Sequence, residues 1–198
     1  ITLERVSFSD SVTYIGKSAF ENCPMLLEIT VPEEITTIED RTFFRCKALK
    51  TLHVHDNIRV VGEYAFAECT DLDTLLLDAI ETIGAGAFHD CTDLKMLRLG
   101  ENVKSIGFEA FGGCTNIESV DWNVKKCTAP NPLKGVKASN ITTFRIGNKV
   151  SVLPARLCAG MSSVTTIAVP PTVRSIGEGA FPGCSKLQSI NLPEGLAR

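Results

Sequence analysis

The chain repeats a pattern of apolar positions about every 23 residues. Its clearest marker is Ala-Phe-x-x-Cys, in which a cysteine follows a phenylalanine by three residues. Five such cysteines lie at intervals of 23, 23, 22 and 23 residues, and a sixth lies 70 residues beyond the fifth. They are Cys23, Cys46, Cys69, Cys91, Cys114 and Cys184. Self-similarity at a fixed period of this length indicates a solenoid, in which each coil buries its apolar side against its neighbours.

A second pattern, L-x-x-I-x-L, begins three residues after the cysteine position, for example at Leu72, Leu75 and Leu77. The last two apolar residues are two apart, so on a strand both point inward and the residues between and beside them face solvent. The pattern recurs nine times. It predicts about nine coils of roughly 23 residues, whose strands form one parallel sheet.

The segment between successive strands carries turn signals. Proline follows several strands, as at Val31-Pro32, and an Ile-Gly pair such as Ile83-Gly84 precedes Ala-Phe-x-x-Cys. Proline ends a strand, and the glycine suits a tight turn into a short helix. We therefore expect an α/β, right-handed solenoid with the parallel sheet on its concave face and short helices and turns on its convex side.

The pattern is degenerate between residues 123 and 160. In one coil Ala138 takes the cysteine position after an inserted residue, and in the next Cys158 and Met161 take the phenylalanine and cysteine positions. The stretch 123–137 keeps almost none of the pattern and predicts a loop that bulges from the convex side. We assign residues 1–198 to a single domain. It is expected to be a fragment of a longer array, because no polar cap is recognisable at either end.

The unit L-x-x-I-x-L-P, Ile-Gly, Ala-Phe-x-x-Cys resembles the BspA-like leucine-rich repeats, and the resemblance covers essentially the whole chain. Proteins of that family are mostly large surface or secreted proteins of host-associated bacteria and some protists. Several are implicated in adhesion to host proteins and cells. The resemblance implies a leucine-rich-repeat solenoid, a cell-surface or secreted location and a binding role of the host-adhesion type, with a host matrix protein as one possible ligand.

Composition narrows the classes of partner. The chain has 198 residues, of which 44% are hydrophobic and 22% charged, and no apolar run approaches the roughly 20 residues of a membrane span. We expect a soluble segment that does not insert into a membrane, as a monomer or as part of a larger chain. The net charge of −3 and the absence of a basic run argue against nucleic acid as a partner.

The cysteine column allows two interpretations. Stacked positions roughly 5 Å apart lie within disulfide Cα distance. One cysteine per coil at an inward position also suits a small buried hydrophobe, and no C-x-x-C pair supplies zinc spacing. We favour buried free thiols. Cys127 lies outside the pattern, in the expected loop, and is predicted to be the exposed, reactive thiol.

The outward position between the two inward strand residues varies most from coil to coil, which favours a surface that grips a protein or a glycan. The predicted contacts are His53, His55, Leu76, Arg98, Asp121 and Arg145. The alternative for any one of these residues is that it lies on a solvent-exposed sheet and contacts no ligand. Trp122 occupies an inward position, where core packing is expected.

His53 and His55 form His-x-His on an expected strand, beside Asp78 of the next coil, and a zinc site or a metal-dependent hydrolase is the alternative there. No third histidine is near in sequence, so we predict no metal and no cofactor. Nucleophile triads, phosphate-binding glycine loops and zinc-protease motifs are all absent from the sequence. We therefore expect a binding module and not an enzyme. A structural spacer and an intracellular interaction scaffold remain alternatives.

Overall fold

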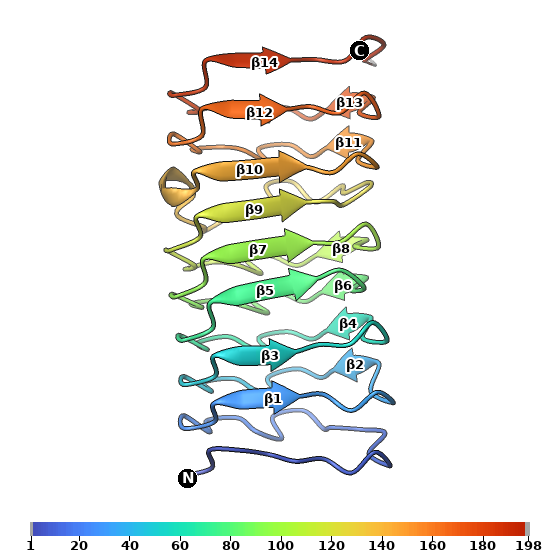
Figure 1. Ribbon diagram of the computed structural model, residues 1–198, viewed down its shortest axis with the longest axis vertical. Coiled ribbons are helices and arrows are strands. Elements are labelled where there is room, and N and C mark those ends of the chain that lie inside the picture. The colour runs from blue at the N-terminus through green and yellow to red at the C-terminus, as the bar shows by residue number, and fades with distance from the viewer. Residues whose placement is uncertain (1, 197–198) are drawn as a thin grey trace.

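The computed structural model describes residues 2–196, which form a column of stacked coils (Figure 1). One strand of each coil lies on the face toward the viewer, which we call the front face. The front strands are β1 (Glu28–Thr30), β3 (Thr51–His53), β5 (Thr74–Leu77), β7 (Met96–Leu99), β9 (Ser119–Trp122), β10 (Thr143–Ile146), β12 (Thr166–Ala168) and β14 (Ser189–Asn191). An isolated parallel bridge from Arg5 to Glu28 extends this row toward the N-terminus. The predicted parallel solenoid is confirmed.

The front strands pair in parallel with the repeat in register. Leu75 pairs with Leu97, and Leu97 pairs with Val120, so equivalent positions of successive coils lie side by side. The row is divided into three ladders, β1–β3, β5–β7–β9–β10 and β12–β14. Among residues 2–196, no backbone hydrogen bond joins β3 to β5.

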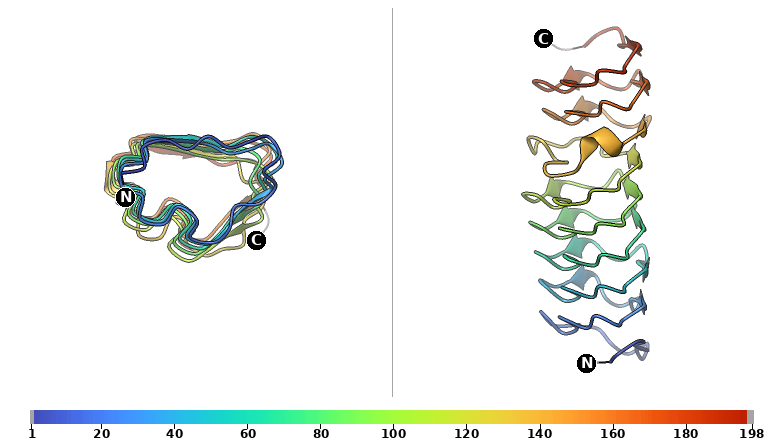
Figure 2. Two further views of the ribbon diagram at one scale, coloured as in Figure 1. Left: turned by 90° about the horizontal axis from the view of Figure 1, so that it is seen from below. Right: turned by 90° about the vertical axis from the view of Figure 1, so that its left-hand side faces the viewer.

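The prediction of one sheet is incomplete, because six of the coils form a second, two-residue strand on the opposite side. These rear strands are β2 (Thr37–Ile38), β4 (Val60–Val61), β6 (Thr82–Ile83), β8 (Ser105–Ile106), β11 (Val152–Leu153) and β13 (Ser175–Ile176). They form the ladders β2–β4–β6–β8 and β11–β13. Seen along its axis and from the side, the column runs nearly straight, so the face predicted to be concave is close to flat (Figure 2).

The predicted convex helices are wrong. In residues 2–196 the only helix is the three-residue 3-10 helix η1 (Ala138–Asn140). The reason is a pair of left-handed residues in each coil, four positions apart, such as Tyr64 at φ 53° and Glu68 at φ 59°. A right-handed helix cannot pass through them. Between them the amide of Phe66 donates to the carbonyl of Ala87 in the next coil at 2.8 Å, and not to a residue of its own turn.

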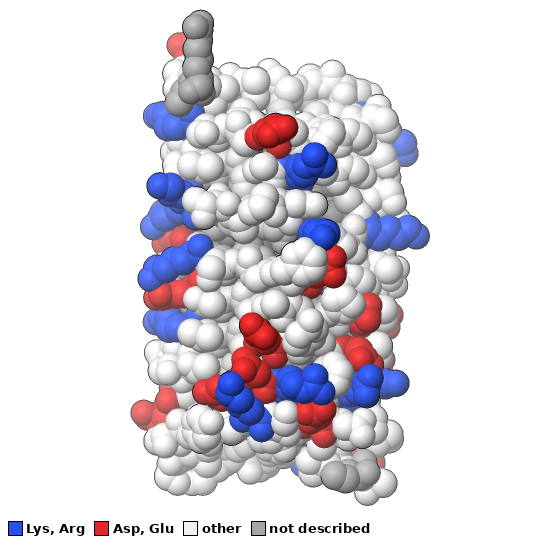
Figure 3. All heavy atoms as spheres, turned by 180° about the vertical axis from the view of Figure 1, so that it is seen from behind, with Lys and Arg blue, Asp and Glu red and all other residues white. Residues whose placement is uncertain are grey.

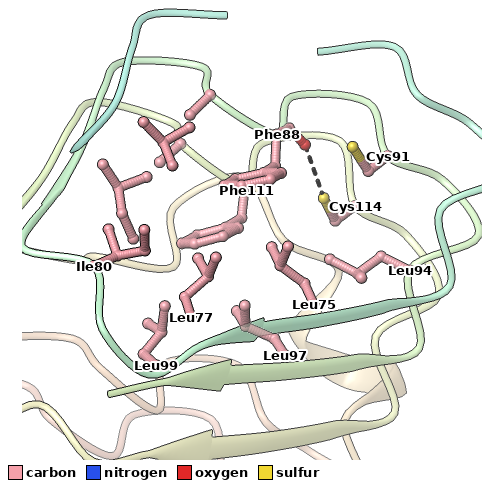
Figure 4. Close-up of a cluster of buried hydrophobic side chains, with 14 of the residues drawn as sticks. Leu75, Leu77, Ile80, Phe88, Cys91, Leu94, Leu97, Leu99, Phe111 and Cys114 are labelled. Atoms are coloured by element: carbon pink, nitrogen blue, oxygen red, sulfur yellow. Dashed lines mark hydrogen bonds between the residues drawn. The ribbon is translucent and has the colours of Figure 1, made fainter. Parts of the chain in front are cut away.

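The core is a set of columns that run through the stack. Neighbouring rings of Phe20, Phe43, Phe66, Phe88 and Phe111 are stacked with centroids 5.2–5.7 Å apart. Beside them the cysteine thiols are free, and those of Cys46, Cys69, Cys91 and Cys114 donate to phenylalanine carbonyls of the preceding coil. Cys114 Sγ, for example, lies 3.2 Å from Phe88 O (Figure 4). The interpretation of this column as buried thiols agrees with the structure, and the thiol–carbonyl contacts add a polar link between coils.

Residues 123–137 do not bulge out as a loop. Val124 and Cys127 are buried, and Leu133 is buried at the place that phenylalanine holds elsewhere. The coil keeps its two left-handed residues, Asn131 at φ 52° and Gly135 at φ 85°, so Val136 and not Ala138 follows the second one at the cysteine position. In the next coil Cys158 and Met161 stand where they were predicted, two residues after Arg156 and one after Gly160, both at positive φ.

The prediction that Cys127 is exposed and reactive is also wrong. Its side chain is 2% exposed, and burial raises the pKa of its thiol. A thiol that stays protonated at neutral pH is a poor nucleophile.

No helix of the described residues is long and apolar enough to cross a membrane.

Candidate binding face

The front strands align most of the predicted contact residues in one row. Leu76 on β5, Arg98 on β7, Asp121 on β9 and Arg145 on β10 are successive partners in the register of the sheet. Leu76 is 44% exposed, which is high for a large apolar side chain. His53 is also exposed, at the end of β3 across the break in the sheet. Alternation along the strands points these side chains outward because Leu75, Leu77, Leu97 and Leu99 fill the core.

The charges in this row are paired. Asp121 lies between two arginines, with Oδ1 3.1 Å from Arg145 Nη1 and Oδ2 3.4 Å from Arg98 Nε. Arg98 also lies 3.7 Å from Asp78. The Asp121 side chain is 15% exposed and that of Arg145 is 66% exposed. The arginines therefore largely neutralise the carboxylate, and Arg145 presents the most accessible charge to a partner.

His55 lies beyond the end of β3 and is mostly buried, so it does not form an outward-facing pair with His53. Strand β3 ends at His53, so the alternation that predicted a histidine pair stops before His55. Its side chain is 11% exposed, and Asn57 N–H donates to Nδ1 at 3.2 Å. The hydrogen is therefore on Nε2, which donates to the carbonyl of Pro32 at 2.7 Å. His55 ties its own coil to the preceding one.

A hollow of about 450 Å³ opens on the front face where β3 and β5 are not hydrogen-bonded. It is lined by predicted residues, His53, His55 and Leu76, and by residues that the sequence did not single out, above all Leu52 and Val54. These two occupy inward positions of the repeat but are only partly buried. In the sequence they look the same as the buried residues of other coils, so no local signal marked them.

A second hollow of about 330 Å³ lies at the carboxyl ends of β5, β7, β9 and β10. Its lining is polar and includes Asn123, Glu101 and Lys149. The Glu101 carboxylate lies 3.0 Å from Lys149 Nζ and 3.1 Å from Lys125 Nζ, and these two ammonium groups lower its pKa. The sequence analysis missed this cluster, because it depends on which turns stack on one another.

Trp122 is fully buried, as predicted, and its indole Nε1 has no hydrogen-bond partner. It therefore packs in the core and does not present a stacking surface. No group of three or more His, Cys, Asp or Glu side chains among the described residues is arranged to hold a metal ion.

The rear face has a different character (Figure 3). Toward the N-terminal end it carries interleaved positive and negative side chains. Ion pairs between coils there include Arg41 with Glu21 at 2.6 Å and Arg45 with Glu68 at 3.0 Å. Exposed pairs of this kind contribute about 0–1 kcal/mol each to stability. The front face thus differs in combining a hollow of mixed apolar and polar lining with a short row of paired charges.

Comparison with known proteins agrees with the repeat. The sequence matches the family described as the BspA type leucine rich repeat region (6 copies), over residues 1–118, 76–131 and 135–198. No curated protein matches it. Among solved structures, a leucine rich repeat protein of T. pallidum is similar to it at 24% identity, with a TM-score of 0.57, over 87% of this chain and 70% of that chain.

Two further solved structures resemble the chain more distantly. The pneumococcal vaccine antigen PcpA is 19% identical, with a TM-score of 0.49, over 86% of this chain and 52% of that chain. A leucine rich cell surface protein from Faecalibacterium prausnitzii A2-165 is 18% identical, with a TM-score of 0.41, over 94% of this chain and 72% of that chain. The T. pallidum structure supports the solenoid fold.

Proposed function

Since this chain belongs to the BspA-type leucine-rich repeat family, we propose that it is a non-catalytic binding module that engages a protein through its front face. The observation that carries the proposal is the row formed by Leu76, Arg98, Asp121 and Arg145. Four hydrogen-bonded strands hold these unlike side chains in register. A rigid, solvent-facing row costs little conformational entropy on binding.

A protein fits this row better than the alternatives do. The row places one exposed apolar side chain next to opposite charges, and protein interfaces combine apolar anchors with hydrogen-bonded polar groups and arginine. A glycan is the second candidate, favoured by the polar hollow that contains Asn123, Glu101 and Lys149. Hydroxyl groups of a sugar could hydrogen-bond to such amide, carboxylate and ammonium groups.

The proposal extends to location. A cell-surface or secreted protein of the host-adhesion type, with a matrix protein as ligand, is the form of this function that the family resemblance favours. Limited proteolysis of intact cells that express the full-length gene tests the location. Cleavage of the protein while cytoplasmic markers stay intact would support it, and full protection would favour an intracellular scaffold.

Binding is tested by screening the purified chain against a panel of extracellular matrix proteins and a glycan array. The informative variant is the triple substitution Arg98→Ala, Asp121→Ala and Arg145→Ala. A matched control is Arg59→Ala, Glu81→Ala and Lys104→Ala, which removes a carboxylate paired with two cations beside the rear strands. We expect at least tenfold weaker binding for the front variant and less than twofold change for the control.

Three results would change the proposal. Equal binding by both variants would move the binding site off the front row. Binding to glycans alone would replace the protein ligand with a sugar. If no ligand binds, the chain is better described as a spacer, and its deletion from the full-length protein should alter reach but not affinity.

A further inference from the structure

The break between β3 and β5 changes the front face locally. β3 bonds to β1, and β5 bonds to β7, but within residues 2–196 no backbone hydrogen bond crosses from β3 to β5. The two strands lie visibly farther apart than β5 and β7 do (Figure 1). On the rear, β4 and β6 remain paired through Val60 and Thr82. The stack therefore opens on the front only, as a groove between two strand edges.

The groove reaches the core. The inward residues of the neighbouring strands are almost fully buried, with Ile29 at 0% and Leu75 at 1% exposure. Leu52 on β3 and Val54 just beyond its end hold inward repeat positions but are partly exposed, and both line the hollow. Exposed Leu76 stands on its other side. An apolar side chain that entered here would remove apolar surface of both β3 and β5 from water.

The rim supplies polar groups of two kinds. Strand edges without a partner present N–H and C=O groups that an extended chain can bond. Glu33, Asp73 and Lys50 also line the hollow, so two carboxylates stand against one ammonium group. This balance favours a ligand with a basic residue near its apolar one.

We infer that the β3–β5 groove captures an extended peptide segment of a partner protein, with an apolar side chain of that segment seated between Leu52, Val54 and Leu76. The inference rests on the proposed function, since it names the kind of partner and the part of the front face that it meets. A sugar meets fewer of these features, because among the described residues no Phe, Tyr or Trp ring lines the hollow for a sugar to stack on, whereas its aliphatic side chains and strand edges suit an extended peptide.

The test uses random twelve-residue peptides displayed on phage and selected on the immobilised purified chain. Enriched peptides are then synthesised, and their Kd is measured by fluorescence anisotropy against three proteins. These are the unmodified chain, Leu76→Lys, which places a charge at the groove, and Ala168→Lys. Ala168 is exposed at the equivalent position of β12, outside the groove, and provides a matched control.

The inference predicts peptides with a shared apolar residue, at least tenfold weaker binding to Leu76→Lys and less than twofold change for Ala168→Lys. Hydrogen exchange should also slow in β3 and β5 when a peptide binds, and not in β12 and β14. Failure to enrich any peptide, equal binding to both variants, or protection outside β3 and β5 would overturn it. If a glycan binds the unmodified chain and Ala168→Lys but not Leu76→Lys, the groove is a sugar site, and this result would also overturn the inference.

These outcomes separate the groove from the wider proposal. Suppose that a protein ligand no longer binds the variant of Arg98, Asp121 and Arg145, but binds Leu76→Lys normally and is not displaced by saturating peptide. This result would support the front-face function and reject the groove as its binding site. Peptide binding that depends on Leu76, in the absence of any ligand from the matrix and glycan screens, would retain the groove and reject the wider proposal.

Discussion

The coils between Phe20 and Cys114 and the coil that spans residues 123–139 follow the same path with different side chains. In the regular coils stacked rings and thiol–carbonyl contacts fill the interior. Each boundary is also closed on the turn side by three amides, as when Tyr64, Phe66 and Glu68 donate to the next coil at 3.0, 2.8 and 2.7 Å. Side chains and backbone reinforce one another there.

The irregular coil keeps the turn geometry and loses most of that reinforcement. Its left-handed residues Asn131 and Gly135 are spaced as elsewhere, and Leu133 replaces the phenylalanine. At the turn positions where each regular boundary has three such amides, the described residues show only Gly113 N–H to Gly135 O and Asn131 N–H to Ala155 O, at 3.0 and 2.8 Å, and Lys137 N–H adds a longer bond of 3.4 Å to Cys114 O. The comparison shows that the backbone turn defines a coil and that the Ala-Phe-x-x-Cys motif strengthens it.

High pH should have the largest effect, because it destabilises the regular coils through their buried thiols. Burial raises the pKa of Cys46 to about 12 and raises those of Cys69 and Cys91 well above their ordinary range. Above about pH 8.5 the unfolded thiols ionise while the folded ones stay protonated, so the folded state binds more protons and stability falls as pH rises. Each such thiol lowers the free energy of unfolding by about 1.4 kcal/mol per pH unit, so the three together lower it by on the order of 5–10 kcal/mol by pH 10.5.

Urea unfolding midpoints between pH 7 and 10.5, measured under reducing conditions, check this dependence. Cys91→Ala should reduce the slope, and Cys127→Ala, whose thiol pKa is raised less, should reduce it less. A midpoint that does not change with pH would show that the thiols titrate freely in the folded protein.

Truncation of a core ring should have the next largest effect. Phe88 is fully buried between Phe66 and Phe111, with centroids 5.4 and 5.7 Å away, so Phe88→Ala should cost about 3–5 kcal/mol. Leu133→Ala in the irregular coil should cost about 2 kcal/mol, the lower end for leucine, because fewer inter-coil bonds hold its surroundings in place. Chemical denaturation of both variants gives the comparison, and a larger loss for Leu133→Ala would reverse it.

Substitution at the left-handed positions should have the smallest effects. Gly135→Ala places a Cβ at φ 85° and 2.8 Å from Gly112 Cα, and should cost about 1–2 kcal/mol. Arg156→Gly removes a side chain from φ 58° at an exposed site, and should stabilise the protein by up to about 1 kcal/mol. Tm measurements test the signs, and destabilisation by both changes would mean that the left-handed turns do not limit stability.

The sequence was most informative where side chains alternate between core and solvent. The register of Leu75, Leu97 and Val120 placed Arg98 next to Asp121, and the ion pair follows from that placement. The sequence predicts helices on the turn side because Ile-Gly followed by Ala-Phe-x-x-Cys fits a tight turn into a helix, and most of the left-handed residues that prevent a helix are not glycine. Tyr64 and Arg156 carry no sign of their backbone conformation in their side chains.

The candidate site was less accessible to prediction for a related reason. His55 was assigned to the face by extending the alternation two residues beyond the end of β3. The exposure of Leu52 and Val54 arises at a boundary between coils, where β3 and β5 are not paired, and the repeat pattern within either coil does not mark it. Patterns within a coil were therefore reliable, and contacts between coils were reliable only where the repeat is regular.

The bonds between coils also determine how the column would respond to mechanical load. The hydrogen bonds that join one coil to the next run along the stack, so tension between its two ends would pull directly against them, one boundary at a time. A released coil of 23 residues extends to about 80 Å in place of the roughly 5 Å that it occupies in the stack. Under stretching, the protein would act as an extensible tether that lengthens in steps of about 75 Å and dissipates mechanical energy at each step.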